Sequence, residues 1–331
     1  MSDSARPRLI VTRHLPDPVE ARIRHDYNAL LNSEDTRFAP EPWLERCRGA
    51  DGLLCTPTDR LNAELIGKLP ASVRIIATFS VGYNHIDIPA AHARGIVVTN
   101  TPGVLTDATA ELAMLLLLAA ARRASEGETL MRARAWSIWG RNQILGTQMS
   151  GKSLGIVGMG RIGSAVARRA AAFDMQIHYL SRSPKSVPDV PTARQHTSEE
   201  TFWPACQFLS LHLPLNPDTR GFLNASRIAH LPRGAIVVNT ARGEVVDDDA
   251  LIAALRSAQV AAAGLDVFTN EPDFRAEYAA LPNTFLLPPY AEFTSSVARA
   301  LMNLLLTLPV YSILRSRTEG GRKSEAHFAK F

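Results

Sequence analysis

The stretch "SLGIVGMGRIGSAVARRAAAF", from Ser153 to Phe173, joins a short apolar run to a helix-forming run through three glycines. "SLGIV" predicts a β-strand, and "SAVARRAAAF" predicts a helix. Gly158, Gly160 and Gly163 lie between them in the spacing GxGxxG, which also occurs by chance in surface turns. Here the flanking strand and helix supply the context that a nucleotide site needs. The glycines permit a tight turn and the close approach of a pyrophosphate, which the helix N-terminus can bind.

The end of the following strand indicates which dinucleotide is bound. The strand "QIHYL" is followed by Ser181, Arg182, Ser183 and, slightly later, Lys185. No carboxylate stands there to accept hydrogen bonds from both ribose hydroxyls, which is the feature that selects NAD. The planar guanidinium of Arg182 can hold a 2′-phosphate instead, with the serine hydroxyls contributing. The alternative is a solvated arginine on a loop. The sequence thus predicts that NADP(H) is preferred over NAD(H).

Strands and helices alternate on both sides of this stretch. Alternation at this spacing predicts parallel α/β sheets. The upstream strand-like runs are Arg8 to Arg13, Gly52 to Cys55, Arg74 to Ser80 and Gly95 to Gly103, with a helix-like segment from Asn62 to Leu69. The downstream runs are Phe208 to Pro214, Ala235 to Thr240 and Ala261 to Phe268. Between the two groups, Thr106 to Trp136 predicts one long buried helix that Thr106 or Asp107 can cap.

The chain length suits two domains, because 331 residues exceed one core of common size. We expect a substrate domain formed by residues 1–100 and completed by 289–331, and a dinucleotide-binding domain formed by 101–288.

Composition and charge exclude several partners. The net charge is only +4 and the basic residues are scattered, which argues against nucleic-acid binding. The longest apolar run, Leu112 to Ala121, is about half of a membrane span, and the N-terminus lacks the apolar core of a signal peptide. Cys47, Cys55 and Cys206 form no CxxC pair, and their odd number favours reduced thiols in a cytoplasmic protein.

Four blocks of sequence carry a resemblance to a known family. They are "SVGYNHID" at Ser80 to Asp87, "VGMGRIG" at Val157 to Gly163, "VVNTARGEVVD" at Val237 to Asp247 and "AAAGLDVFTNEP" at Ala261 to Pro272. Over roughly Arg8 to Leu287 the chain resembles the D-isomer-specific 2-hydroxyacid dehydrogenases. Thr101 to Arg123 and the pair Trp136 and Trp139 are most similar to the glyoxylate/hydroxypyruvate reductases within that family.

The resemblance implies a fold, a reaction and an assembly. The fold is α/β, with two Rossmann-like doubly wound parallel-sheet domains and a cleft between them. The reaction is the NAD(P)H-dependent reduction of a small 2-keto acid, glyoxylate or hydroxypyruvate, to the D-2-hydroxy acid. The assembly is a homodimer with the region of Trp136 and Trp139 as a contact.

It also implies roles for individual residues. Arg242 would bind the substrate carboxylate and polarise the adjacent ketone, with a structural salt bridge as the alternative. The backbone N–H groups of Val81 and Gly82 would bind the same carboxylate, since glycine lets a ligand approach the main chain. Glu271 is the acidic partner that raises the basicity of a catalytic histidine. Asp266 would lie near the nicotinamide carboxamide, unless it only caps a strand end.

The residues that would bind the cofactor lie in several turns, and no metal ion is expected. Pro214 would form a wall of the adenine pocket. The implied set is Gly158, Gly160, Arg161, Ile162, Gly163, Ser181, Arg182, Pro214, Thr219, Thr240 and Asp266.

The catalytic histidine itself is missing. The family reads "LPH", then a small residue, glycine and serine, with a threonine shortly after. Aligned from Asn283, this chain has Pro289 at the histidine position, while Ala291 and Glu292 replace the glycine and serine and Thr294 still matches. Proline has no proton to donate, and it restricts φ.

Two other side chains carry a proton. Tyr290 has a hydroxyl, but alternation along an extended chain directs it to the opposite face. His85 is the nearest imidazole by motif position, although a loop histidine with satisfied hydrogen bonds is the alternative.

Two functions from different classes therefore stay open. One is a reductase slowed by the loss of a general acid, which contributes about 10²–10⁴ in rate. The other is a catalytically weak or inactive NAD(P)-binding sensor on the same fold. Arg242 and Glu271 favour the enzyme, and the missing histidine favours the sensor. A third explanation is that the segment after Leu287 is an altered end of an ordinary enzyme.

Overall fold

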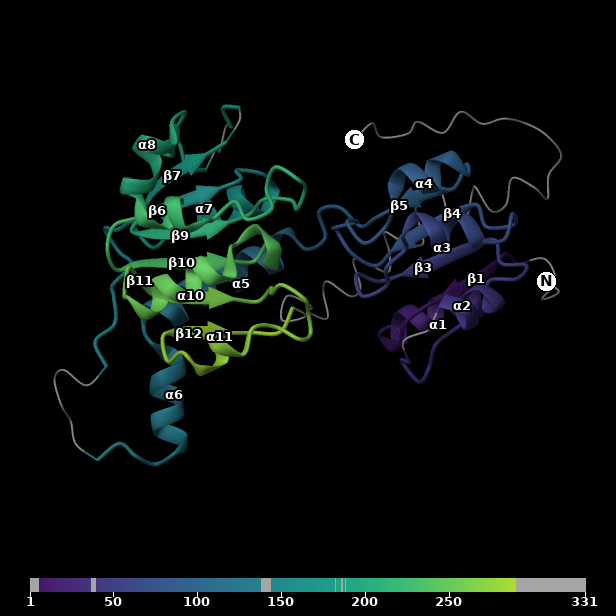
Figure 1. The fold of residues 1–331 in the computed structure, drawn as a ribbon, viewed down its shortest axis with the longest axis horizontal. Coiled ribbons are helices and arrows are strands. Elements are labelled where there is room, and N and C mark those ends of the chain that lie inside the picture. Colours follow the sequence, from purple (N-terminus) through teal and green to yellow (C-terminus); the bar gives the residue numbers. More distant parts are fainter. Residues whose placement is uncertain are drawn as a thin grey trace. The chain divides into compact units, whose positions relative to one another are not determined.

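The structure, a computed structural model, describes residues 6–36, 40–137, 144–181, 183–185, 187 and 189–289. These residues divide into two compact units at Val104 and Leu105. We call them the N-terminal unit and the central unit, and each is described by itself (Figure 1). The predicted assignment of 289–331 to the first domain falls almost wholly outside the described residues.

The N-terminal unit is built on one parallel five-stranded sheet. Its strands have the order β2-β1-β3-β4-β5, so the direction of winding reverses between β1 and β3, as in doubly wound folds. The central strands are apolar and buried, which forms the core of this unit. The elements are β1 (Arg8–Val11), α1 (Asp17–Asp26), β2 (Asn28–Leu30), α2 (Pro40–Arg46), β3 (Gly52–Cys55), α3 (Ala63–Lys68), β4 (Ile75–Thr78), α4 (Ile88–Ala93) and β5 (Val97–Thr99).

The central unit is built on a parallel seven-stranded sheet of order β12-β11-β10-β9-β6-β7-β8, which reverses between β6 and β9. Its helices are α5 (Thr106–Ala121), α6 (Ala124–Arg132), α7 (Arg161–Ala171), α8 (Glu199–Phe202), α9 (Ala225–Ala229), α10 (Asp248–Arg256) and α11 (Ala276–Ala280), with 3₁₀ turns η2 (Trp203–Ala205) and η3 (Gly243–Val245). Its strands are β6 (Ser153–Val157), β7 (Gln176–Leu180), β8 (Arg194–His196), β9 (Phe208–Leu211), β10 (Ala235–Asn239), β11 (Val260–Leu265) and β12 (Thr284–Leu286). The prediction of two doubly wound parallel sheets is confirmed.

Helix α5 is buried on most of its surface, as its composition predicts. It packs against α7 and against β10 and β11. Gly264 in β11 makes this packing close, because a Cβ there would lie 2.9 Å from Cβ of Leu116. The helix therefore helps to fix the strands whose carboxyl ends carry the candidate site.

The prediction of a single helix from Thr106 to Trp136 is wrong. The helix ends at Ala121, Arg123 adopts a left-handed conformation with φ of 52°, and α6 begins at Ala124. A distant segment causes the break, because the N–H of Thr147 donates to the carbonyl of Ala121 at 2.7 Å. Nor does Thr106 or Asp107 cap α5: the N-cap is Leu105, with no side-chain hydrogen bond.

The three cysteines are buried and form no disulfide, as predicted. Among the described residues, no helix combines the length and apolar character needed to cross a bilayer.

Candidate functional site

The glycine-rich turn after β6 has a separate geometric reason for each glycine. Gly158 has φ of +94°, and a Cβ there would lie 2.6 Å from the carbonyl oxygen of His212. A Cβ on Gly163 would lie 2.2 Å from the carbonyl oxygen of Gly158. By contrast, a Cβ on Gly160 would meet nothing within 4 Å. The first and third glycines thus let the turn close, and the second faces open space in which a pyrophosphate fits.

The N-terminus of α7 provides hydrogen-bond donors beside that space. Gly160 is its N-cap residue and makes no side-chain cap, so the first-turn N–H groups, which include Arg161 and Ile162, have no capping side chain. The helix is 11 residues long and follows β6 at the point where the sheet reverses. Free N–H groups and the positive end of the helix dipole suit a phosphate at this edge of the sheet.

The turn directly after β7 is polar, and its described residues from Ser181 to Lys185 contain no carboxylate. The hydroxyl of Ser181 donates to the carbonyl of Ser183 at 2.9 Å, and Lys185 is exposed. Arg182, which the sequence singles out as the binder of a 2′-phosphate, lies outside the described residues. Pro214 and Thr219 are brought together elsewhere on the same edge, since the Thr219 hydroxyl donates to the carbonyl of Pro214 at 2.6 Å.

Asn239, at the end of β10, organises the part of the site that contains Arg242. Its side chain accepts a hydrogen bond from the N–H of Ala241 at 3.0 Å and donates to the carbonyl of Arg242 at 2.9 Å. The carbonyl of Asn239 also accepts from the N–H of Asp266 at 3.4 Å, across to β11. The sequence reasoning missed this residue. A polar residue ending a fully buried apolar strand was the signal that pointed to it.

Thr240 gives a test of whether a cofactor fits here. Its hydroxyl is buried and has no hydrogen-bond partner among the described residues. A buried hydroxyl without a partner is costly, and a ligand's polar group would satisfy it. Together with the open space above Gly160, this observation shows that the central unit fits a dinucleotide.

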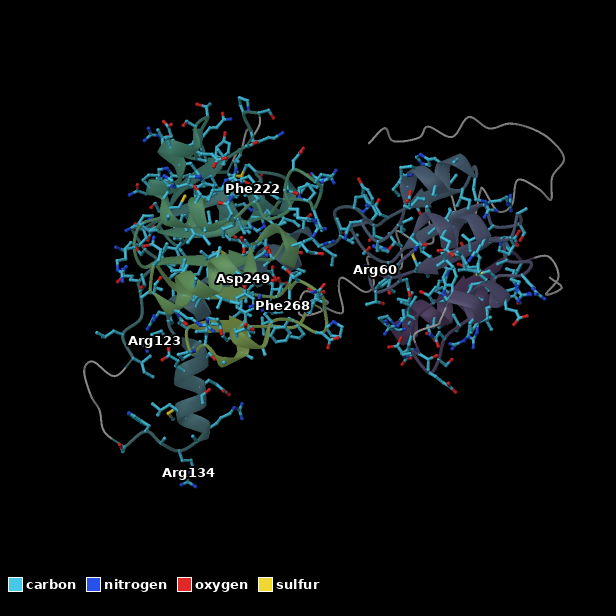
Figure 2. All side chains as sticks on the ribbon, viewed as in Figure 1. Arg60, Arg123, Arg134, Phe222, Asp249 and Phe268 are labelled. Carbon is cyan, nitrogen blue, oxygen red and sulfur yellow. The ribbon has the colours of Figure 1, made fainter. Side chains whose placement is uncertain are left out.

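Arg242 and Glu271 lie on neighbouring turns of the central unit. A Cβ on Gly243 would lie 2.0 Å from the carbonyl carbon of Phe268, so only glycine lets the turn after Arg242 pack against Phe268, which Figure 2 labels. The N–H of Phe268 donates to Oε1 of Glu271 at 2.7 Å, which holds the carboxylate beside this contact. Burial raises the pKa of Glu271, while the Phe268 N–H and the charge of Arg242 act in the opposite direction. The Glu271 side chain keeps exposed surface, and a partly desolvated carboxylate near an arginine is suited to proton chemistry.

Val81 and Gly82 lie three and four residues beyond the end of β4, in the loop at the carboxyl edge of the sheet of the N-terminal unit. Both residues are half-buried. Their N–H groups make no hydrogen bond to any residue that the structure describes. Two adjacent unused donors at a strand end are able to bind a carboxylate.

The position of the missing histidine is described, whereas its neighbours are not. Pro289 is exposed and follows β12 by three residues. Tyr290, Ala291, Glu292 and Thr294 lie outside the described residues. His85, the other imidazole considered above, has Nε2 at 2.9 Å from the hydroxyl of Thr78 and 4.0 Å from Sγ of Cys55.

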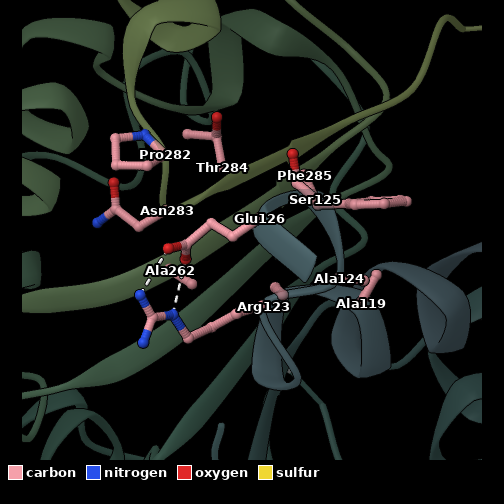
Figure 3. Close-up of a pocket in the computed structure, with 11 residues that line it drawn as sticks. Ala119, Arg123, Ala124, Ser125, Glu126, Ala262, Pro282, Asn283, Thr284 and Phe285 are labelled. Carbon is pink, nitrogen blue, oxygen red and sulfur yellow. Dashed lines mark hydrogen bonds and ion pairs between the residues drawn. The ribbon is translucent and has the colours of Figure 1, made fainter. Parts of the chain in front are cut away.

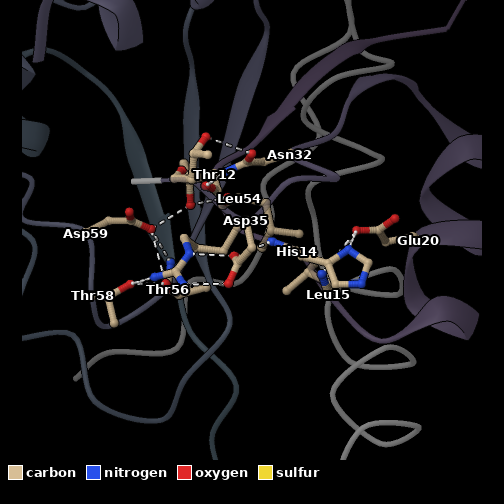
Figure 4. Close-up of polar contacts among 12 residues, drawn as sticks. Thr12, His14, Leu15, Glu20, Asn32, Asp35, Leu54, Thr56, Thr58 and Asp59 are labelled. Atoms are coloured by element: carbon tan, nitrogen blue, oxygen red, sulfur yellow. Dashed lines mark hydrogen bonds and ion pairs between the residues drawn. The ribbon is translucent and has the colours of Figure 1, made fainter. Parts of the chain in front are cut away.

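A polar cluster at the carboxyl ends of β1 and β3 occupies a second place where α/β sheets often bind ligands (Figure 4). Two guanidinium nitrogens of Arg13 donate to the carboxylate of Asp35, each at 2.7 Å, and a third donates to Thr58 at 2.6 Å. Asp59 accepts from the hydroxyl of Thr12 at 2.5 Å and from the N–H of Thr56 at 2.8 Å. These charges satisfy one another, so the cluster serves to hold the loops.

A small pocket lies between the α5–α6 corner and the beginning of β12 (Figure 3). Alanine side chains and the ion pair of Arg123 with Glu126 line much of it. It includes Asn283 and Ala262, which lie near the amino ends of β12 and β11. Ligands of doubly wound sheets bind at the carboxyl ends, so this pocket is not the candidate site. Within the described ranges, no three His, Cys, Asp or Glu side chains gather closely enough to hold a metal ion.

Comparison with known proteins identifies a family. Residues 114–291 match the model of the D-isomer specific 2-hydroxyacid dehydrogenase NAD binding domain. The chain is 42% identical to the glycerate dehydrogenase of Hyphomicrobium methylovorum over 286 residues, which cover 86% of this chain and 89% of that protein. It is 39% identical to the glyoxylate reductase of Thermococcus litoralis over 304 residues, which cover 91% of this chain and 92% of that protein.

A solved structure of the same family is also similar to this chain. The NADPH-dependent glyoxylate/hydroxypyruvate reductase of Sinorhizobium meliloti, solved with NADP and malonate, is 32% identical to the chain. The match has a TM-score of 0.82 and covers 91% of this chain and 92% of that one.

Proposed function

The chain belongs to the D-isomer-specific 2-hydroxyacid dehydrogenase family, and from that premise we propose that it reduces glyoxylate or hydroxypyruvate to the D-2-hydroxy acid. The observation that carries this proposal is the combination, within one unit, of the turn from Gly158 to Gly163 with Arg242 and Glu271 on adjoining turns. The first feature fits a dinucleotide, and the second supplies a cation for a small anionic substrate and a carboxylate whose pKa is raised. Relatives described as glyoxylate and glycerate enzymes support the choice of substrate.

The roles of the residues follow from their chemistry. A bound nicotinamide dinucleotide would supply the hydride to the carbonyl carbon. The guanidinium of Arg242 binds the substrate carboxylate and withdraws electron density from the ketone, which stabilises the charge that develops on oxygen. The N–H groups of Val81 and Gly82, in the N-terminal unit, are donors suited to a substrate carboxylate. Thr240 and Asp266 would hold the nicotinamide end of the cofactor, and the first turn of α7 would hold its pyrophosphate.

We propose that proton delivery is the weak step. Pro289 stands where the family has its histidine, so Glu271 has no imidazole at that position to polarise. A rate reduced by about 10²–10⁴ relative to a complete site is expected, since that is the usual contribution of a general acid.

We propose NADPH as the preferred cofactor. Directly after β7, the described residues Ser181, Ser183 and Lys185 offer hydroxyls and an exposed cation, and Arg182 follows Ser181 in the sequence. The carboxylate of Asp189, further along, pairs with Arg168 at 3.4 Å. A carboxylate directly after β7 would repel the 2′-phosphate, and its absence removes that repulsion. The Sinorhizobium meliloti relative is described as NADPH-dependent, which supports the same preference.

The same observation at Pro289 favours a second candidate, a protein that binds NAD(P) without turnover and acts as a sensor. Steady-state assays with glyoxylate and hydroxypyruvate, each with NADPH and with NADH, distinguish the two. The reductase proposal expects slow but measurable oxidation of NADPH that depends on the keto acid. Tight cofactor binding with no turnover on either acid would reject the reductase and leave the sensor.

We also propose that the chain is a homodimer that associates through α6. None of the residues of α6 is buried, and Figure 1 shows this helix extending away from the sheet of its unit. Met131, on α6, is 58% exposed, and Trp136, four residues after its end, is 51% exposed. Exposed apolar side chains on a projecting helix are typical of an interface. Trp139, the other half of the predicted contact, lies outside the described residues.

A further inference from the structure

We propose that Thr78, Ser80, His85 and Asn100 form a positioning network that fixes the N–H groups of Val81 and Gly82 before the substrate arrives. The inference rests on the proposed function, since it concerns the binding of the keto acid's carboxylate. All the residues of the network belong to the N-terminal unit. The side chains of the network act through the backbone of the loop, and none of them needs to touch the substrate.

Three successive carbonyl groups in the loop after β4 each accept a hydrogen bond. The carbonyl of Ser80 accepts from the N–H of Thr101 at 3.0 Å. The carbonyl of Val81 accepts from the side-chain amide of Asn100 at 2.7 Å, and the carbonyl of Gly82 accepts from the hydroxyl of Ser80 at 2.5 Å. Since the peptide group is planar and trans, holding a carbonyl also sets the direction of the following N–H. The first two bonds therefore orient the N–H groups of Val81 and Gly82.

The oriented donors are not used by the rest of the described chain. The N–H groups of Val81 and Gly82 have no hydrogen-bond partner there, although the three carbonyls around them are all occupied. Donors held in place before binding cost little reorganisation when a charge arrives. This pattern is the one expected for an anion site rather than for an ordinary loop.

The hydroxyl protons of Ser80 and Thr78 determine which atom donates in the hydrogen bonds that link Ser80, Thr78 and His85. The hydroxyl of Ser80 donates its only proton to the carbonyl of Gly82. In its 2.9 Å contact with the hydroxyl of Thr78, Ser80 must therefore accept the hydrogen bond. The hydroxyl of Thr78 therefore donates its proton to Ser80. In its 2.9 Å contact with Nε2 of His85, the Thr78 oxygen accepts the hydrogen bond. It follows that Nε2 of His85 carries a proton and donates it to Thr78.

Because its residues are buried, each hydrogen bond of this network is costly to remove. Thr78 has no exposed surface, and Ser80 is 6% exposed. Water cannot replace a lost partner at such positions, so one missing hydroxyl leaves a neighbouring polar atom unsatisfied. The network therefore predicts a role for His85 that differs from proton donation to the ketone, because its Nε2 proton is already committed to Thr78.

Thr78→Val tests the network because valine keeps the shape of threonine and removes its hydroxyl. The matched control is Thr99→Val, since the Thr99 hydroxyl is buried and has no partner among the described residues. Binding of oxamate, a non-reducible analogue of a 2-keto acid, is measured by titration calorimetry on the full chain saturated with NADPH. We expect the Kd for oxamate to rise about tenfold in Thr78→Val and to stay within about twofold in Thr99→Val. The Kd for NADPH should not change in either variant.

Equal oxamate affinity in Thr78→Val and Thr99→Val would overturn the inference while leaving the proposed function intact. A wild-type chain that neither binds oxamate nor reduces glyoxylate would overturn both. Ser80→Ala and Asn100→Asp provide independent variants if Thr78→Val does not fold. Each removes one donor of the network, and each is expected to weaken oxamate binding by a similar factor.

His85→Gln and His85→Ala separate positioning from acid catalysis. The amide of glutamine can supply an N–H donor near the position of Nε2, but it cannot act as a general acid. We expect His85→Gln to retain the wild-type kcat and oxamate affinity, and His85→Ala to raise KM for glyoxylate with a smaller change in kcat. If both variants lose kcat equally while KM is kept, His85 is the proton donor and the inference is wrong.

Discussion

Under the proposed function, residue 289 is where the chain lacks a proton donor, and this is expected to limit its rate. Pro289 is exposed and has no ionisable group, so it leaves Glu271 without an imidazole partner at that position. A carboxylate whose pKa is raised by burial is still able to polarise a neighbouring imidazole if one is supplied. The site is therefore open to repair by substitution.

Pro289→His is expected to raise kcat more than it lowers KM, because a general acid acts mainly in the transition state. The gain should be smaller than the full factor of about 10²–10⁴, since Ala291 and Glu292 also differ from the family pattern. Steady-state kinetics with glyoxylate and NADPH measure both constants. The adjacent Pro288→His is a matched control, because Pro288 is also exposed and is one residue out of register. A wild-type kcat already near about 10 s⁻¹ would contradict the premise that a donor is missing.

Residue 182 is expected to set the cofactor preference. NADPH should bind more tightly than NADH, and Arg182→Ala should narrow that difference by about 1–3 kcal/mol, the scale of losing a hydrogen bond to a charged group. Dissociation constants for the two cofactors, measured by fluorescence titration, give the comparison. Lys185→Ala controls for a general loss of positive charge, since Lys185 is an exposed cation on the same loop. Equal dissociation constants in the unmodified protein would refute the preference.

At the scale of elements, local sequence predicts the buried strands and one edge strand, β5 (Val97–Thr99), but misses the other edge strands. The apolar runs that became β3, β9 and β10 are buried along their whole length, so their patterns are unambiguous. The edge strands β2, β8 and β12 have three residues each and pair on one side only, so they carry little apolar signal. None of these three was predicted.

For the helices and the site as well, features set by contiguous sequence were predictable and features set by distant contacts were not. At the break between α5 and α6, the carbonyl of Ala121 accepts a hydrogen bond from the N–H of Thr147, 26 residues further along the chain. The hydrophobic pattern around Ala121 does not indicate a contact that distant in sequence. The roles of Gly158 and Gly163 were predictable because strand, turn and helix are contiguous in sequence. The hydrogen bonds from Asn239 to the carbonyl of Arg242 and between His85 and Thr78 could not be predicted, because a sequence motif does not specify which side chains come into contact.

The proposed homodimer is tested at α6. Met131→Glu places a charge on the exposed apolar surface of this helix, and we expect it to shift the chain from dimer to monomer because a buried unpaired carboxylate is costly. Sedimentation velocity measures the change. Phe173→Glu is the matched control, since Phe173 is a similarly exposed apolar residue, at 42%, that follows α7 instead. Dissociation by both substitutions, or by neither, would argue against α6 as the interface.

At the scale of the whole molecule, the histidines whose pKa is lowered lie in the central unit. Burial lowers the pKa of His178, His196 and His212, with Arg194 adding to the effect on the first two. His178 and His196 lie side by side on β7 and β8, with 2.9 Å between Nδ1 of the first and Nε2 of the second. For His212 the pKa falls to about 4, and its Nδ1 is buried with no partner in the described chain.

The sign of the pH dependence follows from these directions. A histidine whose pKa is lowered in the folded state binds its proton more readily when the chain unfolds. Its contribution to stability is therefore complete above the unfolded value of 6.5 and is lost as the pH falls toward the folded value. Glu271 acts in the opposite sense, because its raised pKa weakens the folded state as the pH rises above about 4.5. His212 loses its contribution between pH 6.5 and about 4, and His178 and His196 act in the same direction below pH 6.5, so stability should fall with acidification.

We expect the melting temperature of the central unit to drop steadily from pH 7 to pH 5, and His212→Gln to make that drop shallower. Each histidine that takes up a proton only on unfolding lowers the free energy of unfolding by about 1.4 kcal/mol per pH unit below 6.5. Glutamine does not titrate, so the variant should lose one such contribution even if it is less stable at pH 7. Differential scanning calorimetry at several pH values measures the slope, and His230→Gln serves as the control because His230 is exposed. If His212→Gln and His230→Gln have the same slope as the unmodified chain, His212 is already protonated in the folded protein, and the unpartnered Nδ1 must then have found an acceptor.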